Sequence, residues 1–330
     1  MNAQDSNSQR YELMPPTIKR EAVPVSICVL TFNRSSLLRE LLLSLRELSY
    51  RPLEIIVVDN NSEDKTPWMM VREFKDITYF RTERNVGAAA RNVGIRNAAG
   101  EIIITLDDDI MGIKDQDIEK IVSMFLNPRM GAINLRILDN KTGHLCNWVH
   151  HCSEEDYGDK EFRTYEITEG AVAFRKKVVT EAGYYPESYF LSHEGLDLAM
   201  RILDCGFDVT YTNQVSVTHC HANSGRENWI NYYYDTRNQC LIAARLFPLG
   251  YAINYLSRGL LANLVYSVRD GYAGYWAKAV FDGVRGFKQA YKERKPLSRQ
   301  TIDMIRAIDG QKPGLIYMVK KRLFHKGMRL

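Results

Sequence analysis

Three consecutive acids, Asp107, Asp108 and Asp109, follow an apolar run at residues 102–106. The run is typical of a buried strand, and open α/β sheets bind ligands at the carboxyl ends of their strands. Alternate side chains of an extended chain point the same way, so we expect Asp107 and Asp109 to converge while Asp108 points elsewhere. Close carboxylates repel unless a cation joins them, and oxygen ligands suit Mg²⁺ or Mn²⁺. The pattern favours a metal–diphosphate site, and a solvated acidic turn is the alternative.

A second set of acids lies in residues 192–204. Apolar residues recur there at i, i+3, i+4 and i+7, which predicts an amphipathic helix. Glu194 and Asp197 lie on the opposite stripe near its N-terminus, where the helix dipole favours carboxylates. They are either a functional pair or ordinary surface charge at a favourable end. His219 ends a later predicted strand, where it is a ligand, a proton carrier or a packed side chain.

The chain before the three acids predicts a parallel sheet. Residues 25–32 form a near-continuous apolar run typical of a central parallel strand, and leucines recur at helical spacing over residues 37–48. A second strand, residues 53–58, ends at Asp59, which either binds a base or ribose or caps the next helix. Two strands joined by a helix form a βαβ unit. Further predicted elements are a helix at 66–74, a strand at 77–81 and a Gly- and Ala-rich helix at 86–99.

After the acids, strands and helices continue to alternate. No G-x-G-x-x-G follows the first strand, which disfavours a dinucleotide-binding dehydrogenase or epimerase, and no G-x-x-x-x-G-K-[ST] is present, which argues against a P-loop enzyme. Residues 139–164 are irregular and rich in His, Trp and Tyr, and we interpret them as a substrate-facing insertion. The remaining predicted elements are a helix at 115–127 and strands at 131–138, 168–174, 209–212 and 215–218.

The chain combines an acidic body with a basic tail. Residues 271–330 carry 14 Lys/Arg and 4 Asp/Glu, a net charge of +10, against +4 for the whole chain. A basic amphipathic helix with aromatics, as at 274–292, lies on an anionic membrane or packs on the domain or a second subunit. Six scattered Cys predict reduced thiols and a cytoplasmic location. We expect residues 1–22 to be a disordered lead-in without a signal peptide, and no run reaches the about 20 apolar residues of a membrane-spanning helix.

Six motifs occur in order over residues 23–221: VSICVLTFNR, VVDNNSEDKT, RNVGAAARNVGIRNAAGEIIITLDDD, EGAVAFRKKVVTEAGYYPESYF, HEGLDLAMRILDCGFDV and VTH. Together they resemble a bacterial family 2 glycosyltransferase. The resemblance implies a GT-A fold of the α/β class, with a Rossmann-like, mostly parallel sheet flanked by helices and followed by a C-terminal helical extension. It also implies a nucleotide-diphosphate sugar donor, Mn²⁺ or Mg²⁺ as cofactor, and inversion at the anomeric carbon.

The resemblance assigns roles to individual residues. Glu194 and Asp197 match the general-base motif, but Gly195 stands where the family has an Asp. The base is therefore open between Glu194 and Asp197, with a marginal preference for Asp197. The metal ligands are Asp109, the direct ligand, with Asp107 and His219. The nucleotide-sugar site is assigned to Thr31, Phe32, Asp59, Arg84, Asn85, Arg91, Asp107 and Asp108, and the acceptor side to Glu169, Gly170 and His193.

These inferences predict a metal-dependent hexosyl- or deoxyhexosyl-transferase of polysaccharide, glycolipid or other glycoconjugate synthesis. The catalytic domain spans 23–225, and the basic helical region 226–330 contacts acceptor, membrane or a second subunit in a homodimer. The expected partners are a UDP- or dTDP-sugar and a glycan, lipid-linked or other hydroxyl acceptor, with no nucleic acid. The expected location is cytoplasmic, peripheral at the inner face of the membrane. The alternative is a non-catalytic nucleotide-sugar-binding or scaffold protein on the same fold.

Overall fold

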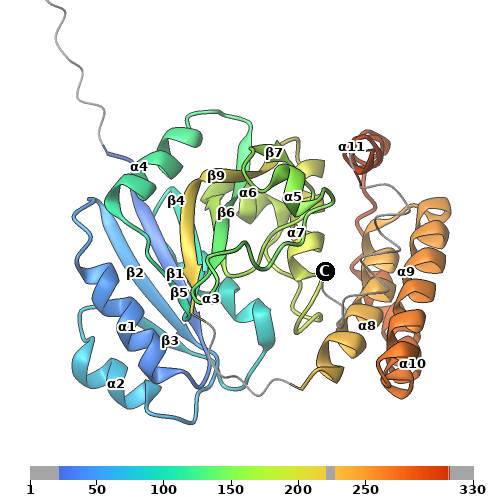
Figure 1. Cartoon of the computed structure of the whole chain (residues 1–330), viewed down its shortest axis with the longest axis horizontal. Helices are drawn as coiled ribbons and strands as arrows, with labels where there is room; N and C mark the ends of the chain where they lie inside the picture. The colour runs from blue at the N-terminus through green and yellow to red at the C-terminus, as the bar shows by residue number, and fades with distance from the viewer. Residues whose placement is uncertain (1–21, 221–226, 311, 313–330) are drawn as a thin grey trace, which may run out of the picture.

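The computed structural model describes residues 22–220, 227–310 and 312. The parallel half of its sheet has the strand order β3-β2-β1-β4 (Figure 1). Thr31 of β1 lies opposite Asp59 of β2, and Leu30 lies opposite Asp107 of β4. The carboxyl ends of the three strands therefore share one edge, as the βαβ pattern predicted. The elements are β1 (Val25–Thr31), α1 (Ser35–Arg46), β2 (Leu53–Asp59), α2 (Thr66–Glu73), β3 (Thr78–Arg81) and β4 (Ile102–Asp107).

Beyond β4 the sheet becomes mixed. β8 runs antiparallel to both β4 and β6, while β6 and β9 are parallel. The two strands predicted at 209–212 and 215–218 are one strand, β9, whose pairing with β6 shifts register within this stretch. The α/β class is confirmed, and the sheet is mixed because this half reverses direction. The strands are β5 (Ile110–Met111), β6 (Met130–Asp139), β7 (Phe162–Arg163), β8 (Ala171–Arg175) and β9 (Asp208–His219).

Helices cover both faces of the sheet, with one apolar core on each side. The helix predicted at 86–99 is a 3₁₀ turn, Gly87–Ala90, followed by α3, Arg91–Asn97. Gly87 has φ +70°, and its amide bonds to the Asn85 side chain, so the chain turns before the helix can begin. The other helices here are α4 (Asp115–Met124), α5 (Glu154–Tyr157), α6 (Lys176–Ala182) and α7 (Glu194–Asp204).

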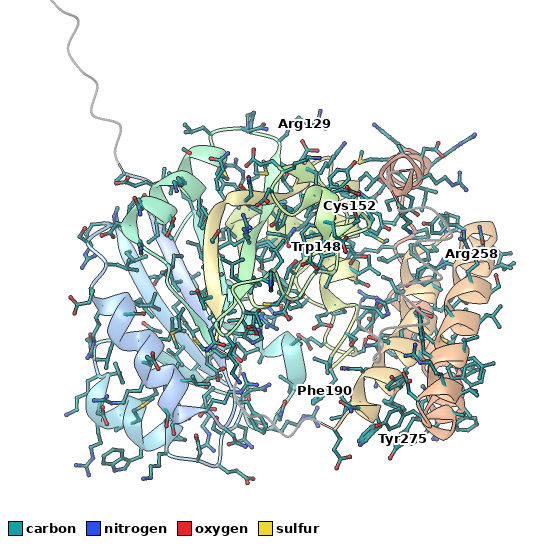
Figure 2. The ribbon with its side chains drawn as sticks, viewed as in Figure 1. Arg129, Trp148, Cys152, Phe190, Arg258 and Tyr275 are labelled. Atoms are coloured by element: carbon teal, nitrogen blue, oxygen red, sulfur yellow. The ribbon has the colours of Figure 1, made fainter. Side chains whose placement is uncertain are left out.

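Four further helices form a layer beside the sheet (Figure 1). Leu241 and Ile242 of α8 and Ile305 of α11 share the core on the α7 side. Phe190, just before α7, stacks on Tyr234 of α8 (Figure 2). The predicted helical extension is thus confirmed for the described residues and packs against the segment that leads into α7. These helices are α8 (Trp229–Leu246), α9 (Leu249–Arg269), α10 (Ala273–Lys292) and α11 (Arg299–Asp309).

Two predictions fall on the ends of the chain. The lead-in, apart from residue 22, and residues 313–330 of the basic tail lie outside the described residues. Among the residues that the structure describes, no helix has both the length and the apolarity needed to cross a bilayer.

Candidate active site

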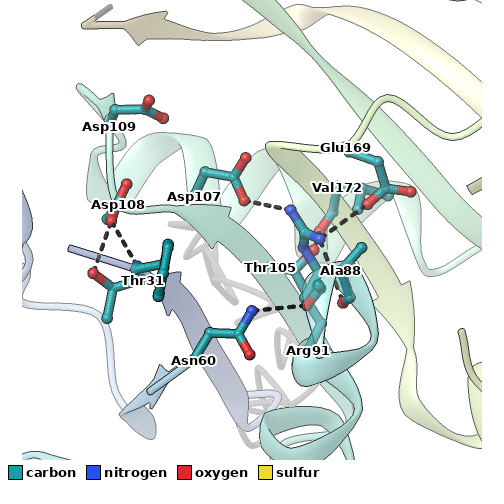
Figure 3. Close-up of polar contacts among 12 residues, drawn as sticks. Thr31, Asn60, Ala88, Arg91, Thr105, Asp107, Asp108, Asp109, Glu169 and Val172 are labelled. Atoms are coloured by element: carbon teal, nitrogen blue, oxygen red, sulfur yellow. Dashed lines mark hydrogen bonds and ion pairs between the residues drawn. The ribbon is translucent and has the colours of Figure 1, made fainter. Parts of the chain in front are cut away.

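The three acids at the end of β4 take different directions (Figure 3). Asp107 pairs with Arg91, whereas Asp108 accepts a hydrogen bond of 2.7 Å from the Thr31 hydroxyl. The strand ends at Asp107 and the chain turns, so the extended backbone that predicted convergence of Asp107 and Asp109 is absent. No group of three His, Cys, Asp or Glu in the described chain is arranged to hold a metal. Convergence on an ion therefore requires side-chain movement.

Asp109 lies between two cationic side chains. Its Oδ2 is 2.6 Å from Arg34 Nη1 and 3.2 Å from His219 Nε2. Burial opposes the charge on Asp109, but His219 and Arg34 outweigh it and lower the pKa of this carboxyl. Burial likewise opposes the charge on His219, yet the hydrogen bond to Asp109 raises its pKa to about 9. The structure thus brings His219 and Asp109 together, as predicted.

Arg34 is a site residue that the sequence did not reveal. Its Nη1 also lies 3.0 Å from Asp108 Oδ1, so one guanidinium bridges two of the three acids. Burial raises the pKa of Asp108 to about 7, although Arg34 acts against the rise. Its role could have been inferred from its position just after β1, because the carboxyl ends of β1 and β4 lie at the same edge of the sheet.

Arg91 opens α3 and lies buried beneath the donor side of the site. It pairs with Asp107, and its Nη1 lies 3.6 Å from Glu169 Oε2. The neighbouring Gly170 accepts a hydrogen bond of 2.9 Å from the Asp107 amide and has φ +114°. Glu169 and Gly170, predicted on the acceptor side, therefore lie beside the end of β4. Burial raises the pKa of Glu169 to about 8, and Arg91 only partly offsets it.

The two predicted bases differ in their surroundings. Asp197 is fully buried, and its oxygens bind Arg201, Arg245 and the Tyr189 hydroxyl at 2.7 to 2.9 Å. Glu194, in the first turn of α7, lies close enough to Arg91 that its charge raises the pKa of the Arg91 guanidinium. The geometry therefore disfavours Asp197 as a proton acceptor, because both oxygens are already occupied.

The segment before α7 is strained and firmly held. Phe190, Ser192 and His193 all have positive φ, which is costly for residues other than glycine. Asn238 of α8 donates hydrogen bonds to the carbonyls of Tyr189, Leu191 and Ser192. His193, predicted on the acceptor side, is the residue that precedes α7. Such strain persists only where surrounding contacts fix it, and it clusters at functional sites.

The predicted nucleotide side is less uniform. Phe32 is 41% exposed at the end of β1, so its ring is available for stacking. Asp59 is fully buried and accepts hydrogen bonds from the Ser62 amide (2.7 Å) and the Tyr79 hydroxyl (2.6 Å). Asn85 accepts a hydrogen bond from Asn60, whereas Arg84 is exposed outside these contacts. The buried Asp59 side chain thus stabilises the turn after β2 through its hydrogen bond from the Ser62 amide.

Comparisons with known proteins agree with this arrangement. The sequence model described as Glycosyl transferase family 2 matches residues 26–181. The O-antigen chain rhamnosyltransferase RfbN of Salmonella typhimurium is 23% identical over 222 residues, which cover 63% of this chain and 70% of that protein. The stretch that the family model matches contains β2, β4 and all of β1 except its first residue, and the ends of these strands carry the site.

Two solved structures share the fold. The mannosyltransferase PcManGT from Pyrobaculum calidifontis, in complex with GDP-Man and Mn²⁺, aligns with a TM-score of 0.53 at 16% identity, covering 96% of this chain and 91% of that one. Residues 1–349 of S. aureus TarS, in complex with UDP-GlcNAc, align with a TM-score of 0.56 at 17% identity, covering 87% and 88%. The fold, the site at the strand ends and these matches together place the chain among the family 2 glycosyltransferases, with a GT-A fold.

Proposed function

We propose that this glycosyltransferase uses Mn²⁺ or Mg²⁺ and transfers a hexosyl or deoxyhexosyl group, with inversion, to a hydroxyl of a glycan or lipid-linked acceptor. The observation that carries the proposal is a pair of contacts at the shared edge of β1 and β4, Asp107 with Arg91 and Asp109 with His219. The similarity to an O-antigen rhamnosyltransferase supports a role in polysaccharide synthesis.

The side chains present suit a hard divalent cation. Asp109 and Asp107 offer carboxylate oxygens and His219 offers an imidazole nitrogen, a set that Mn²⁺ or Mg²⁺ accepts. The bound ion would neutralise charge on the leaving nucleoside diphosphate. Arg34 now neutralises Asp108 and Asp109, so it moves toward the diphosphate when an ion takes over that role. Mn²⁺ in the PcManGT structure supports this assignment.

The remaining residues bind and orient the donor. Phe32 stacks on the nucleoside base above the turn that Asp59 supports, and Thr31 holds Asp108 at the back of the site. Arg91 lies under the sugar with Asp107. UDP or dTDP is the expected carrier, and UDP-GlcNAc in the TarS structure supports it.

Thermal stability with added ligand tests this function, since a ligand that binds only the folded chain raises the melting temperature. We expect Mn²⁺ plus one class among UDP-, dTDP- and GDP-sugars to raise it, and Asp109→Ala to remove the shift. The control is Glu187→Ala. Glu187 is 71% exposed and pairs with Arg96 outside the site, so this variant should keep the full shift in melting temperature. A scaffold protein that lost its donor site would show no shift with any nucleotide class.

We further propose that the outer face of α9 and α10 lies on an anionic membrane. Leu261 of α9 and Phe281 and Val284 of α10 are each more than half exposed. Basic side chains flank them (Figure 2 shows Arg258): Arg258, Arg285, Lys288 and Lys292. Apolar side chains beside cations match the acyl boundary and headgroups of such a surface.

Co-sedimentation with phosphatidylglycerol-containing vesicles tests the membrane assignment. Phe281→Ser with Val284→Ser should reduce binding, while Trp68→Ser, an exposed aromatic on α2, should leave it unchanged. If the wild type does not sediment but has twice the chain mass in solution, and the double variant is monomeric, this face is a homodimer contact instead.

A further inference from the structure

Glu169 presents a buried carboxylate that lacks a hydrogen bond from the described residues. Both of its oxygens are buried and accept no hydrogen bond of normal geometry, although the Tyr185 hydroxyl lies close enough to lower the pKa of this carboxyl. Its ion pair with Arg91 is long, at 3.6 Å. Leaving a buried acceptor unsatisfied costs roughly 1–3 kcal/mol, and more for a charged one. A carboxylate kept in this condition next to a substrate site is poised to accept a hydroxyl from the ligand.

The space that Glu169 occupies is the one that Gly195 leaves empty. A Cβ atom on Gly195 would overlap Glu169 Oε1 and lie only 2.7 Å from the Ile167 carbonyl oxygen. A side chain at 195 would therefore force the carboxylate of Glu169 out of its present position. The acid next to this position of α7 therefore comes from the segment before β8 and not from the helix itself.

Glu169 also lies next to the donor end of the site. The carbonyl of its neighbour Gly170 accepts a hydrogen bond from the Asp107 amide, and Arg91 pairs with both Asp107 and Glu169. The antiparallel pairing of β8 with β4 fixes this closeness, because Leu106 lies opposite Ala171. A hydroxyl held by Glu169 is thus placed beside the sugar that Asp107 and Arg91 help to bind.

We propose that Glu169 is the catalytic base of the transfer, an inference that rests on the proposed inverting function. The acceptor oxygen forms a bond to the anomeric carbon as the bond from that carbon to the diphosphate oxygen breaks. The electron pair of the broken bond leaves with the nucleoside diphosphate. The proton of the acceptor hydroxyl passes to a Glu169 carboxylate oxygen.

Glu169 fits this role better than the two acids of α7. Asp197 has both oxygens engaged by Arg201, Arg245 and Tyr189. Glu194 is 3% exposed and lies in the first turn of α7, where the helix dipole stabilises its charged form and weakens it as a base. The side chain of Glu169 is 24% exposed, and its carboxylate lies beside Arg91, which also pairs with Asp107.

The first test compares Glu169→Gln with Glu166→Gln. Glu166 belongs to the same segment, but its charge is coupled to Asp309 and Lys312 at the end of α11. Nucleoside diphosphate release is measured with Mn²⁺ and a panel of UDP-, dTDP- and GDP-sugars, and the affinity for the free nucleoside diphosphate by calorimetry. We expect Glu169→Gln to lower kcat by about 10²–10⁴ with unchanged affinity, and Glu166→Gln to change neither.

Melting temperature separates a catalytic from a structural role. Removing an unsatisfied charge should leave the melting temperature of Glu169→Gln at or above the wild-type value. A clear drop in melting temperature, or wild-type kcat, would overturn the assignment. The melting temperature can be compared even if the wild type releases no nucleoside diphosphate from any donor. That lack of release would contradict the proposed function and not the assignment of Glu169.

A small carboxylate in solution distinguishes Glu169 from Glu194. Formate should restore nucleoside diphosphate release to Glu169→Ala by entering the vacated space, and should not restore it to Glu194→Ala. Restoration of Glu194→Ala alone would assign the proton to Glu194 and reject Glu169.

Discussion

Asp197 and Glu169 are two buried carboxylates on either side of the first turns of α7, and their environments are opposite. Asp197 accepts hydrogen bonds from two arginines and a tyrosine, including Arg245 of α8 at 2.8 Å. Glu169 accepts none from the described residues, and its pKa is raised to about 8 by burial. Asp197 joins the sheet domain to the helical layer, whereas Glu169 faces the donor side.

The difference indicates separate roles for the two acids, one in stability and one in turnover. The acid at 197 is buried in an ion-pair network, and such networks are strongly destabilised when one partner is removed. The acid at 169 is held in an unfavourable state, which active sites tolerate when the strain serves function. Loss of Asp197 should therefore affect folding, and loss of Glu169 should affect turnover.

The largest expected effect is that of Asp197→Asn on stability. Two buried guanidinium groups would lose their counter-charge, so we expect the free energy of unfolding to fall by about 3–5 kcal/mol in urea titration. Asp303→Asn on α11, whose carboxylate is 55% exposed, should cost well under 1 kcal/mol. A stable Asp197→Asn chain that binds nucleotide but transfers no sugar would reverse the comparison and return the base to Asp197.

Gly195→Ala tests the role of Glu169 without changing Glu169 itself. The new methyl group would press on Ile167 and displace the Glu169 carboxylate, so we expect a loss of about 1–3 kcal/mol in the free energy of unfolding together with reduced kcat. Gly250→Ala at the start of α9, where a Cβ meets nothing within 4 Å, should be neutral or slightly stabilising. If Gly195→Ala is as stable and active as wild type, the packing of Glu169 against Gly195 has no role.

A further test concerns Glu166, the neighbour that serves as control. Burial raises its pKa from 4.5 to about 8, with Lys312 opposing and Asp309 adding to the rise. The folded state binds this proton more tightly than the unfolded state, so the contribution of Glu166 to stability is complete below pH 4.5 and is lost as pH rises toward 8.

Glu166→Gln should therefore gain stability relative to wild type as pH rises through that window. Chemical denaturation at pH 5 and pH 8 measures the difference between the two chains. A difference that does not change with pH would mean that Glu166 ionises normally in the folded protein.

Much of the site could be predicted from the local pattern of apolar and polar residues in the sequence. The apolar runs of β1, β2 and β4 identify strands, and a parallel arrangement places their carboxyl ends together, so Thr31, Asp59 and Asp107 were predictable neighbours. The closeness of His219 to Asp109 also agrees with the prediction, because both follow strands that end at this edge. The turn after Asp107 was not predictable, since three acids fit a strand end and a turn equally well.

The sequence by itself determined which residue types stand at the strand ends, because the period of apolar residues defines faces and boundaries within each element. Only the tertiary structure decided which charges meet. Arg245 reaches Asp197 from α8, Arg34 reaches Asp108 and Asp109 from the end of β1, and Glu169 fills the space over Gly195 from the start of β8. These contacts join segments that no short-range period relates, and they depend on how distant elements pack. That packing makes one acid of α7 part of the scaffold and places an acid outside α7 beside Arg91 and the end of β4.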